Sequence, residues 1–332
     1  MLQATVTRLA PLSKPDMTYV VTGVAHAAAV ARQLPDLPDD NIVVEPSARD
    51  SCPAIALAAA IIAQRDPEAV MGSFAADHLI ANQDRFLAAV RTAIDGAQAG
   101  YMMTIGISPT HPETGYGYVR VGEPLGPAGV LGVKEFKEKP SAEVARRYVD
   151  SGDYLWNASM FVWRVDVFLA ELARQCPEIH AGVSAIAEAW HRPERDAVVE
   201  REWPQLPKVP IDTAVMEGAA AAGRVGTVRG SFGWNDVGDF HTLGELLRSD
   251  EHGNVVLDAP FAGSTTKGDV LIRDSSNVVV VPAGGRIVTV VGVSNQVIVD
   301  TQDAILVCAR ERAQDIKRVV DELRARGHAE HV

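Results

Sequence analysis

Two aspartates far apart in the chain stand where a hard metal ion could bind. Asp77 ends the segment FAAD directly after an apolar run, and Asp236 lies in FGWNDVGDF, residues 232–240, between two glycines that allow a close approach to a ligand. Mg²⁺ typically binds one or two carboxylates together with substrate phosphates. Read singly, Asp77 is equally well a helix N-cap, His78 a structural histidine and residues 235–238 a turn. The pair of aspartates predicts a magnesium site.

Three further segments carry residues suited to a phosphorylated sugar. In EFKEKP, Glu138 can accept hydrogen bonds from hydroxyls, and Lys139 supplies a point charge for a phosphate. In WNASMF, Asn157 offers both a donor and an acceptor, and Gly117 in GYGY opens a backbone turn toward a ligand. A solvated edge strand is the alternative interpretation of residues 133–140. Together these segments predict sugar-binding loops.

A fourth segment combines a base-recognition candidate with a helix start. Glu45 closes an apolar run, and its carboxylate could accept from both N1–H and the exocyclic amine of guanine. The segment RDSCPA then opens a predicted helix, with Asp50 or Ser51 as N-cap and Pro53 in the first turn. Because helix N-termini favour anions, a nucleotide can lie here without displacing the cap.

The elements that must hold these residues alternate along the first part of the chain. Apolar β-branched runs alternate with helical segments at a period of roughly 25–30 residues, which predicts an α/β fold with a mostly parallel sheet and crossover helices. Ligands of such sheets bind beyond the carboxyl ends of the strands. The expected strands are 19–23, 41–45, 69–74 and 101–107, and the expected helices are 25–34, 53–64 and 82–99.

The amino-acid composition of the chain changes near residue 250. Residues 254–307 are Val-rich and Gly-punctuated, which predicts many short strands in a separate β domain of coil or sandwich type. Residues 310–326 read as a closing amphipathic helix. We therefore predict a first domain over residues 1–249 and a second over residues 250–332.

Composition limits the classes of partner and compartment. The chain has 332 residues and a net charge of 31 − 43 = −12, which argues against a nucleic-acid or membrane-surface partner. Its three cysteines form no CxxC pair, and its longest apolar run is roughly half of what a bilayer requires. The N-terminal residues do not read as a secretory signal. The sequence predicts a soluble cytoplasmic protein.

Seven motifs carry a family resemblance in their order along the chain: EP…RDSCPAI, FAADH, TGYGY, EFKEKP, WNASMF, IDTAVMEGA and FGWNDVGDF. This series resembles that of bacterial mannose-1-phosphate guanylyltransferases, the GDP-mannose pyrophosphorylases. The C-terminal part is similar to the β-helix-like tail of the same family. The resemblance implies a Rossmann-like nucleotide-sugar transferase domain, followed by a small β-helix-like domain. It also implies Mg²⁺-dependent transfer of GMP from GTP to α-D-mannose 1-phosphate, giving GDP-mannose and pyrophosphate.

The resemblance also implies roles for individual residues. Asp77 and Asp236 match the aspartates that hold Mg²⁺, and Lys139 matches the lysine near the sugar phosphate. The remaining matches are Glu138 and Asn157 at the mannose hydroxyls, Gly117 at the backbone approach to the sugar, Glu45 at base recognition, and Asp50 and Ala76 at the nucleotide. Asp50 stands where the family tends to have Asn.

One departure concerns the start of the sequence. The family begins with a strand and a Gly-rich loop that cradles the triphosphate, whereas Met1-Leu2-Gln3 resembles the helix after that loop. An N-terminally truncated transferase domain with impaired activity is therefore expected. The alternatives are a non-catalytic regulatory or sugar-nucleotide-binding homologue, or a nucleotidyltransferase for another hexose 1-phosphate. The β tail is compatible with a homodimer.

Overall fold

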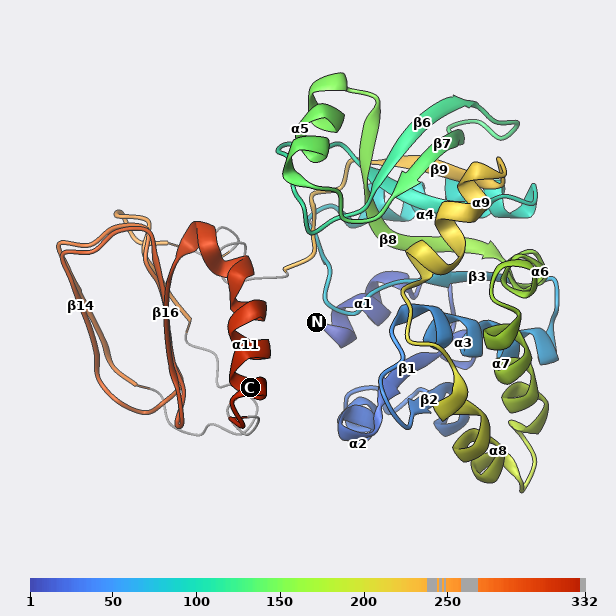
Figure 1. Cartoon of the computed structure of the whole chain (residues 1–332), viewed down its shortest axis with the longest axis horizontal. Helices are drawn as coiled ribbons and strands as arrows, with labels where there is room; N and C mark the ends of the chain where they lie inside the picture. Colours follow the sequence, from blue (N-terminus) through green and yellow to red (C-terminus); the bar gives the residue numbers. More distant parts are fainter. Residues whose placement is uncertain (238–243, 245–246, 248, 258–267, 329–332) are drawn as a thin grey trace. The chain divides into compact units, whose positions relative to one another are not determined.

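The computed structural model describes residues 1–237, 244, 247, 249–257 and 268–328 (Figure 1). The chain divides into two compact units, Met1–Asp236 and Val237–Val332. The domain boundary at residue 249 remains a prediction. Of the segment 232–240, residues 238–240 lie outside the described residues. The two units are described separately.

In the first unit, strands and helices alternate as predicted, and the α/β class is confirmed (Figure 1). Its helices are α1 (Leu2–Leu9), α2 (Val24–Gln33), α3 (Ser51–Arg65), α4 (Gln83–Gln98), α5 (Ala142–Ser151), α6 (Val165–Gln175), α7 (Pro177–Ala189), α8 (Arg195–Glu202) and α9 (Glu217–Ala221), with a π-helical turn η4 (Asp212–Met216). Its strands are β1 (Val20–Gly23), β2 (Ile42–Glu45), β3 (Val70–Ser73), β4 (Leu79–Ile80), β5 (Met102–Ile107), β6 (Tyr118–Pro124), β7 (Leu131–Lys137), β8 (Tyr154–Arg164), β9 (Val225–Gly230) and β10 (Trp234–Asn235).

The sheets differ from the prediction in strand direction. Six strands form one sheet in the order β3-β8-β5-β9-β7-β6, in which β5 and β9 are parallel and the other pairs are antiparallel. The reason on one side is β8, which lies antiparallel between β3 and β5, two strands that share a direction. Among the described strands, β1 and β2 form a separate two-stranded parallel sheet.

Capping side chains fix where the helices begin. The Asp50 carboxylate accepts from the Ser51 N–H at 2.8 Å at the start of α3, and Asn82 Oδ1 accepts from the Arg85 N–H at 3.0 Å at the start of α4. These bonds satisfy amide groups that a helix leaves unpaired at its first turn. The N-cap interpretation of Asp50 is confirmed.

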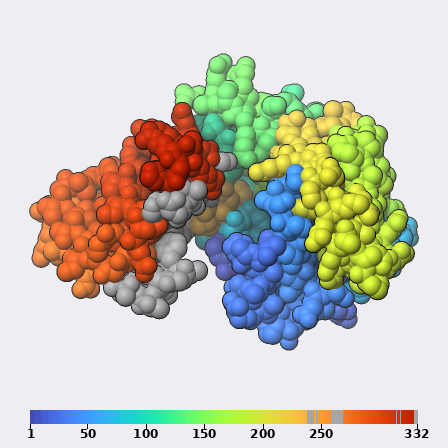
Figure 2. Space-filling view, turned by 60° about the horizontal axis from the view of Figure 1, so that its bottom comes forward, coloured from blue at the N-terminus to red at the C-terminus, as the bar shows by residue number. Residues whose placement is uncertain are grey.

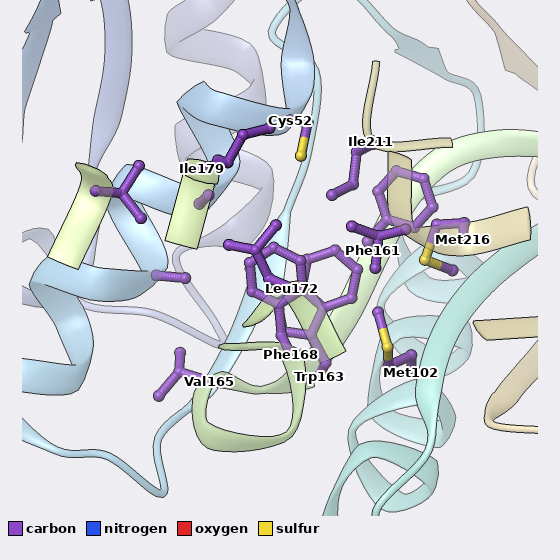
Figure 3. Close-up of a cluster of buried hydrophobic side chains, with 14 of the residues drawn as sticks. Cys52, Met102, Phe161, Trp163, Val165, Phe168, Leu172, Ile179, Ile211 and Met216 are labelled. Carbon is purple, nitrogen blue, oxygen red and sulfur yellow. The ribbon is translucent and has the colours of Figure 1, made fainter. Parts of the chain in front are cut away.

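Side chains alternate between the two faces of the six-stranded sheet, so each face has its own core. On β8, Phe161 and Trp163 join the cluster against α3, α6 and α7, whereas Met160 and Val162 join the cluster against α4. Figure 3 shows the first cluster, in which the Trp163 ring stacks on Phe168 with centroids 4.4 Å apart. Burying one such side chain contributes roughly 1.5–3 kcal/mol, so β8 is anchored strongly from both sides.

The second unit consists of stacked coils. Its strands are β11 (Val255–Val256), β12 (Val270–Arg273), β13 (Val279–Pro282), β14 (Val288–Val291), β15 (Gln296–Asp300) and β16 (Ile305–Ala309), followed by the turn η5 (Arg310–Asp315) and helix α11 (Ile316–Ala325). The pairs β12–β14 and β13–β15 are parallel. Asn277 donates to Asn295, 18 residues further on, at 3.3 Å. Of the two predicted β architectures, the coil is therefore the one observed.

Within the part of the chain that the structure describes, none of the helices combines the length and the hydropathy needed to cross a bilayer.

Candidate active site

The pairing of two short strands that are distant in sequence brings the two predicted metal aspartates into one neighbourhood. Strand β10 pairs antiparallel with β4, with Asn235 opposite Leu79 and Trp234 opposite Ile80. The Ala81 and Asn82 amides add hydrogen bonds to the Phe232 carbonyl, at 3.1 and 2.9 Å. Asp236 directly follows β10, and Asp77 lies two residues before β4. Residues 159 positions apart in the sequence are thus held together by backbone pairing.

His78 lies between these aspartates and the protein interior. Its side chain is buried, and its ring meets the Trp234 ring edge-on with centroids 5.4 Å apart. Burial lowers the pKa of His78, while the charges of Asp77 and Asp236 act in the opposite direction. Both carboxylates are therefore close enough to the imidazole to influence it. The structural interpretation of His78 agrees with this packing.

Tyr116 connects the carboxylates to the neighbouring turn. Its hydroxyl donates to Asp236 Oδ1 at 2.7 Å, and its ring packs edge-on against Trp156 and Trp234, with centroids 5.3 and 5.2 Å away. A phenol held by two indoles has little freedom to turn. Tyr116 therefore fixes the orientation of the Asp236 carboxylate, and the next residue in the chain is Gly117.

Gly117, Glu138 and Asn157 form a second group. A Cβ atom at Gly117 would lie 2.6 Å from Glu138 Oε2 and 3.6 Å from Asn157 Nδ2, so the absence of a side chain lets both polar atoms pack close to the glycine backbone. The backbone amide of Asn157 also donates to the Gly117 carbonyl at 2.8 Å. The three residues come from the turn before β6, the loop after β7 and the middle of β8. One acceptor and one donor therefore face the same glycine, and a side chain at position 117 would displace Glu138.

Lys139 lies at the exposed edge of this second group. Its ammonium is 3.1 Å from Glu138 Oε1, and its side chain is 63% exposed whereas that of Glu138 is 14% exposed. The ammonium is therefore open to solvent, whereas the carboxylate that it pairs with is largely enclosed. The lysine can reach an incoming anion from this position.

The predicted nucleotide residues come from three separate segments. Glu45 ends β2 and is half-buried, and burial raises the pKa of its carboxyl. Asp50 caps α3. Ala76 directly precedes Asp77, and its carbonyl accepts from the Thr5 hydroxyl of α1 at 3.3 Å. A joint role of these residues at the nucleotide stays a prediction.

Two residues of this region were not predicted as site residues. Tyr116 belongs to the motif TGYGY, in which only the glycine was predicted to face a ligand. Asp212 belongs to IDTAVMEGA, where an acidic residue before an alanine-rich run resembles an N-cap. Asp212 is 6% exposed and accepts from Asn157 Nδ2 at 2.8 Å. A buried carboxylate paired to a polar strand residue is visible only once the chain is folded.

The donor set around Asp77 and Asp236 fits magnesium. Two carboxylates are hard oxygen donors, and Mg²⁺ keeps several waters and uses substrate phosphates rather than a closed protein cage. Among the described residues, no group of three or more His, Cys, Asp or Glu side chains is arranged to hold a metal ion.

Comparison with known proteins identifies the family. Residues 1–253 match the family model described as nucleotidyl transferase, and residues 268–323 match the one described as a MannoseP isomerase/GMP-like beta-helix domain. The chain belongs to the nucleotidyl transferase family. The β-helix-like character of the second unit is confirmed by the second match.

Relatives along the whole chain narrow the family further. The mannose-1-phosphate guanylyltransferase of Escherichia coli K12 is 39% identical over 342 residues, covering 100% of this chain and 68% of the relative. The mannose-1-phosphate guanylyltransferase ManC of Salmonella typhimurium is 38% identical with the same coverage. A crystal structure from Thermus thermophilus, described as a mannose-1-phosphate geranyltransferase, has a TM-score of 0.78 and 30% identity, covering 97% of this chain and 89% of that one. The predicted resemblance to this family is confirmed.

Proposed function

We propose that this nucleotidyl transferase transfers GMP from GTP to α-D-mannose 1-phosphate and forms GDP-mannose and pyrophosphate. The observation that carries the proposal is the pair of adjacent residues Tyr116 and Gly117. Tyr116 holds Asp236 beside Asp77 and His78, and Gly117 lets Glu138 and Asn157 pack together against its backbone. A region for charged phosphates and a region for hydroxyls therefore adjoin. The choice of GTP and mannose 1-phosphate as substrates is supported by the relatives, which are mannose-1-phosphate guanylyltransferases.

The reaction requires orientation and charge neutralisation more than covalent help. An oxygen of the sugar phosphate forms a bond to the α-phosphorus of GTP, and the bond from that phosphorus to the pyrophosphate oxygen breaks. In this proposal Glu138 accepts a hydrogen bond from a mannose hydroxyl, and Asn157 donates one. Lys139, whose ammonium is open to solvent, neutralises the sugar phosphate.

Asp77 and Asp236 would hold Mg²⁺ in this scheme. The ion, when bound, neutralises charge that develops on the phosphate oxygens. The contribution of the chain itself is to orient the carboxylates, and the Tyr116 hydroxyl does this for Asp236.

The base end of the nucleotide is assigned to the β2–α3 region. Glu45 would accept from guanine N1–H and from its exocyclic amine, a pair of donors that adenine lacks. Asp50 and Ala76 would border the nucleotide through the start of α3 and the loop before Asp77.

Association of two copies through the second unit is a further element of the proposal, and light scattering tests it.

The test of the function is an assay with GTP, mannose 1-phosphate and MgCl₂ that measures pyrophosphate release and GDP-mannose together. We expect both products in equal amounts from the wild-type chain. Asp236→Asn should lower turnover by at least about 100-fold. The substitution removes a carboxylate ligand of the metal ion that neutralises the negative charge developing on the phosphate. Asp150→Asn, an exposed aspartate on α5, is the matched control and should retain turnover.

Three outcomes would contradict the proposal. Unchanged turnover in Asp236→Asn with normal metal dependence would remove Asp236 from the site. Binding of GDP-mannose without product formation would indicate a regulatory homologue. A preference for UTP or TTP, or for another hexose 1-phosphate, would overturn the assigned substrates and the role of Glu45.

A further inference from the structure

A buried chain of hydrogen bonds runs through the centre of the proposed sugar site. The Thr104 hydroxyl donates to Asn157 Oδ1 at 2.6 Å, and Asn157 Nδ2 donates to Asp212 Oδ1 at 2.8 Å. The three residues are at most 6% exposed. The Ser159 amide also donates to Asn157 Oδ1, at 3.3 Å. The oxygen of the Asn157 side-chain amide is thus committed to the sheet, and its nitrogen faces Asp212.

The second hydrogen of that amide nitrogen points to a specific use. Asn157 Nδ2 carries two hydrogens. Asp212 accepts one at 2.8 Å, and the Ser159 hydroxyl accepts the other at 3.5 Å, which is a long and weak hydrogen bond. The same nitrogen and Glu138 Oε2 lie 3.6 and 2.6 Å from the position that a Cβ of Gly117 would occupy, so both atoms pack on the same side of this glycine. A ligand hydroxyl that reaches both can accept from the amide in place of Ser159 and donate to the carboxylate.

Asp212 itself is held rigidly by the elements around it. It opens the π-helical turn η4, and such turns are frequent at functional sites. The preceding Ile211 donates its amide to the Ser51 hydroxyl at 2.9 Å, and the Ile211 side chain lies in the core near Cys52 and Phe161 (Figure 3). Figure 2 shows this yellow segment beside the blue segment that includes α3. Asp212 is therefore unable to swing away from Asn157 without disturbing the core.

The titratable groups that influence Asp212 come from two elements. The charges of Glu138 and Lys139 act from the loop after β7, and the Cys52 thiol, whose pKa is raised by burial, belongs to α3. Burial, and after it the charge of Glu138, raise the pKa of Asp212 to about 7, while Lys139 and the Asn157 amide oppose the rise. Keeping a carboxyl in so unfavourable a place is costly for folding, which indicates that it serves the site.

We propose that Asp212 is a positioning residue of the sugar site, which holds Asn157 so that its second amide hydrogen meets a hydroxyl of the sugar phosphate beside Glu138. The proposal rests on the proposed function for the identity of that ligand. In it Asp212 acts through Asn157 and has no contact with the reacting phosphorus.

Calorimetric titration of the whole chain with mannose 1-phosphate and, separately, with GTP tests this role. Asp212→Ala should weaken sugar phosphate binding by about tenfold or more, because the Asn157 amide loses its buried acceptor and is free to turn. Its affinity for GTP should stay within about twofold of the wild type. Asp212→Asn should restore sugar phosphate binding to within about threefold, because an amide oxygen still accepts from Asn157. Asp150→Asn is the control.

A double variant keeps the proposal testable if Asp212→Ala fails to fold. Exchanging the two side chains, Asn157→Asp with Asp212→Asn, keeps a hydrogen bond between positions 157 and 212 but removes the donor that faces the hydroxyl. We expect a Tm close to that of Asp212→Asn together with a loss of sugar phosphate affinity of about tenfold or more. Wild-type sugar affinity in the exchanged variant, or equal losses for GTP and sugar phosphate in Asp212→Ala, would overturn the proposal.

The binding experiment also separates this inference from the proposed function. A wild-type chain that binds mannose 1-phosphate but forms no GDP-mannose contradicts the function and leaves the role of Asp212 open to the same titration. A chain that forms product while Asp212→Ala binds the sugar phosphate normally contradicts the inference alone. A wild-type chain that does not bind mannose 1-phosphate contradicts both.

Discussion

At the scale of single residues, the molecule uses one carboxyl in a role that sequence spacing conceals. Asp77, Asp236 and Glu138 were singled out because acids near strand ends are candidates for metal and hydroxyl binding. Asp212 has the same chemistry, but its partner Asn157 lies 55 positions earlier and on a different element. Only the folded chain brings the two together, so Asp212 was beyond the reach of local patterns.

Asp212 also makes stability depend on pH. Its pKa is raised to about 7 in the folded chain, whereas an unfolded aspartate titrates near 3.9. Between these values the folded state holds a proton that the unfolded state has lost, so stability falls as pH rises through this window. Asparagine does not titrate in this range, so Asp212→Asn should lose less stability than the wild type when the pH rises from 5 to 8. The two losses in the free energy of unfolding should differ by up to about 3 kcal/mol.

Urea denaturation at these two pH values measures the difference. Asp150→Asn should follow the wild type at both. Equal losses of stability in Asp212→Asn and the wild type would show that the Asp212 carboxyl titrates normally.

At the scale of elements, a glycine controls the pairing that brings the two metal aspartates together. Gly233 has a φ of 64°, and a Cβ there would lie 2.7 Å from the Ala81 Cβ, directly beside the β4–β10 pair. Gly233→Ala should therefore separate β10 from β4 and displace Asp236. We expect the MgCl₂ concentration for half-maximal product formation to rise by about tenfold or more, because small displacements of a reacting group have large effects.

Gly223→Ala is the matched control for this effect. Gly223 has a φ of 71°, and nothing lies within 4 Å of a Cβ at that position. The left-handed backbone costs each variant about 1–2 kcal/mol, but only in Gly233→Ala does the added Cβ meet a neighbour. The same metal dependence in both variants would show that the pairing of β4 with β10 does not position Asp236.

The elements also show which features local patterns can predict. The strand–helix alternation and the cap at Asp50 depend on neighbours in sequence, and both were predicted from it. The cap at Asn82 was not predicted, because Asp77 was considered as the N-cap instead. The direction of β8 depends on distant partners, and the expectation of a mostly parallel sheet missed its insertion between β3 and β5. In the second unit, Ser276-Asn277 recurs as Ser294-Asn295, a signal for coils that passed unnoticed.

At the scale of the whole molecule, the two units have cores of their own. Val279 is fully buried in the cluster of the second unit, and Val183 is fully buried in the first. Val279→Ala should destabilise the second unit by about 2 kcal/mol and leave mannose 1-phosphate affinity unchanged. Val183→Ala should affect the first unit instead. Scanning calorimetry checks this, and a single transition that both variants shift equally would contradict it.

The separation of the β1–β2 pair from the six-stranded sheet has a consequence for how the protein holds a nucleotide. The proposed base-recognition residue Glu45 ends the β1–β2 pair, while the strands β3 and β8 belong to the other sheet. Among the described strands, no ladder of backbone hydrogen bonds joins the two sheets, which share the core around α3 instead. The distance between the proposed base region and the proposed phosphate region is therefore set by side-chain packing and not by backbone hydrogen bonds. A slight slide of one sheet past the other would lengthen or shorten it.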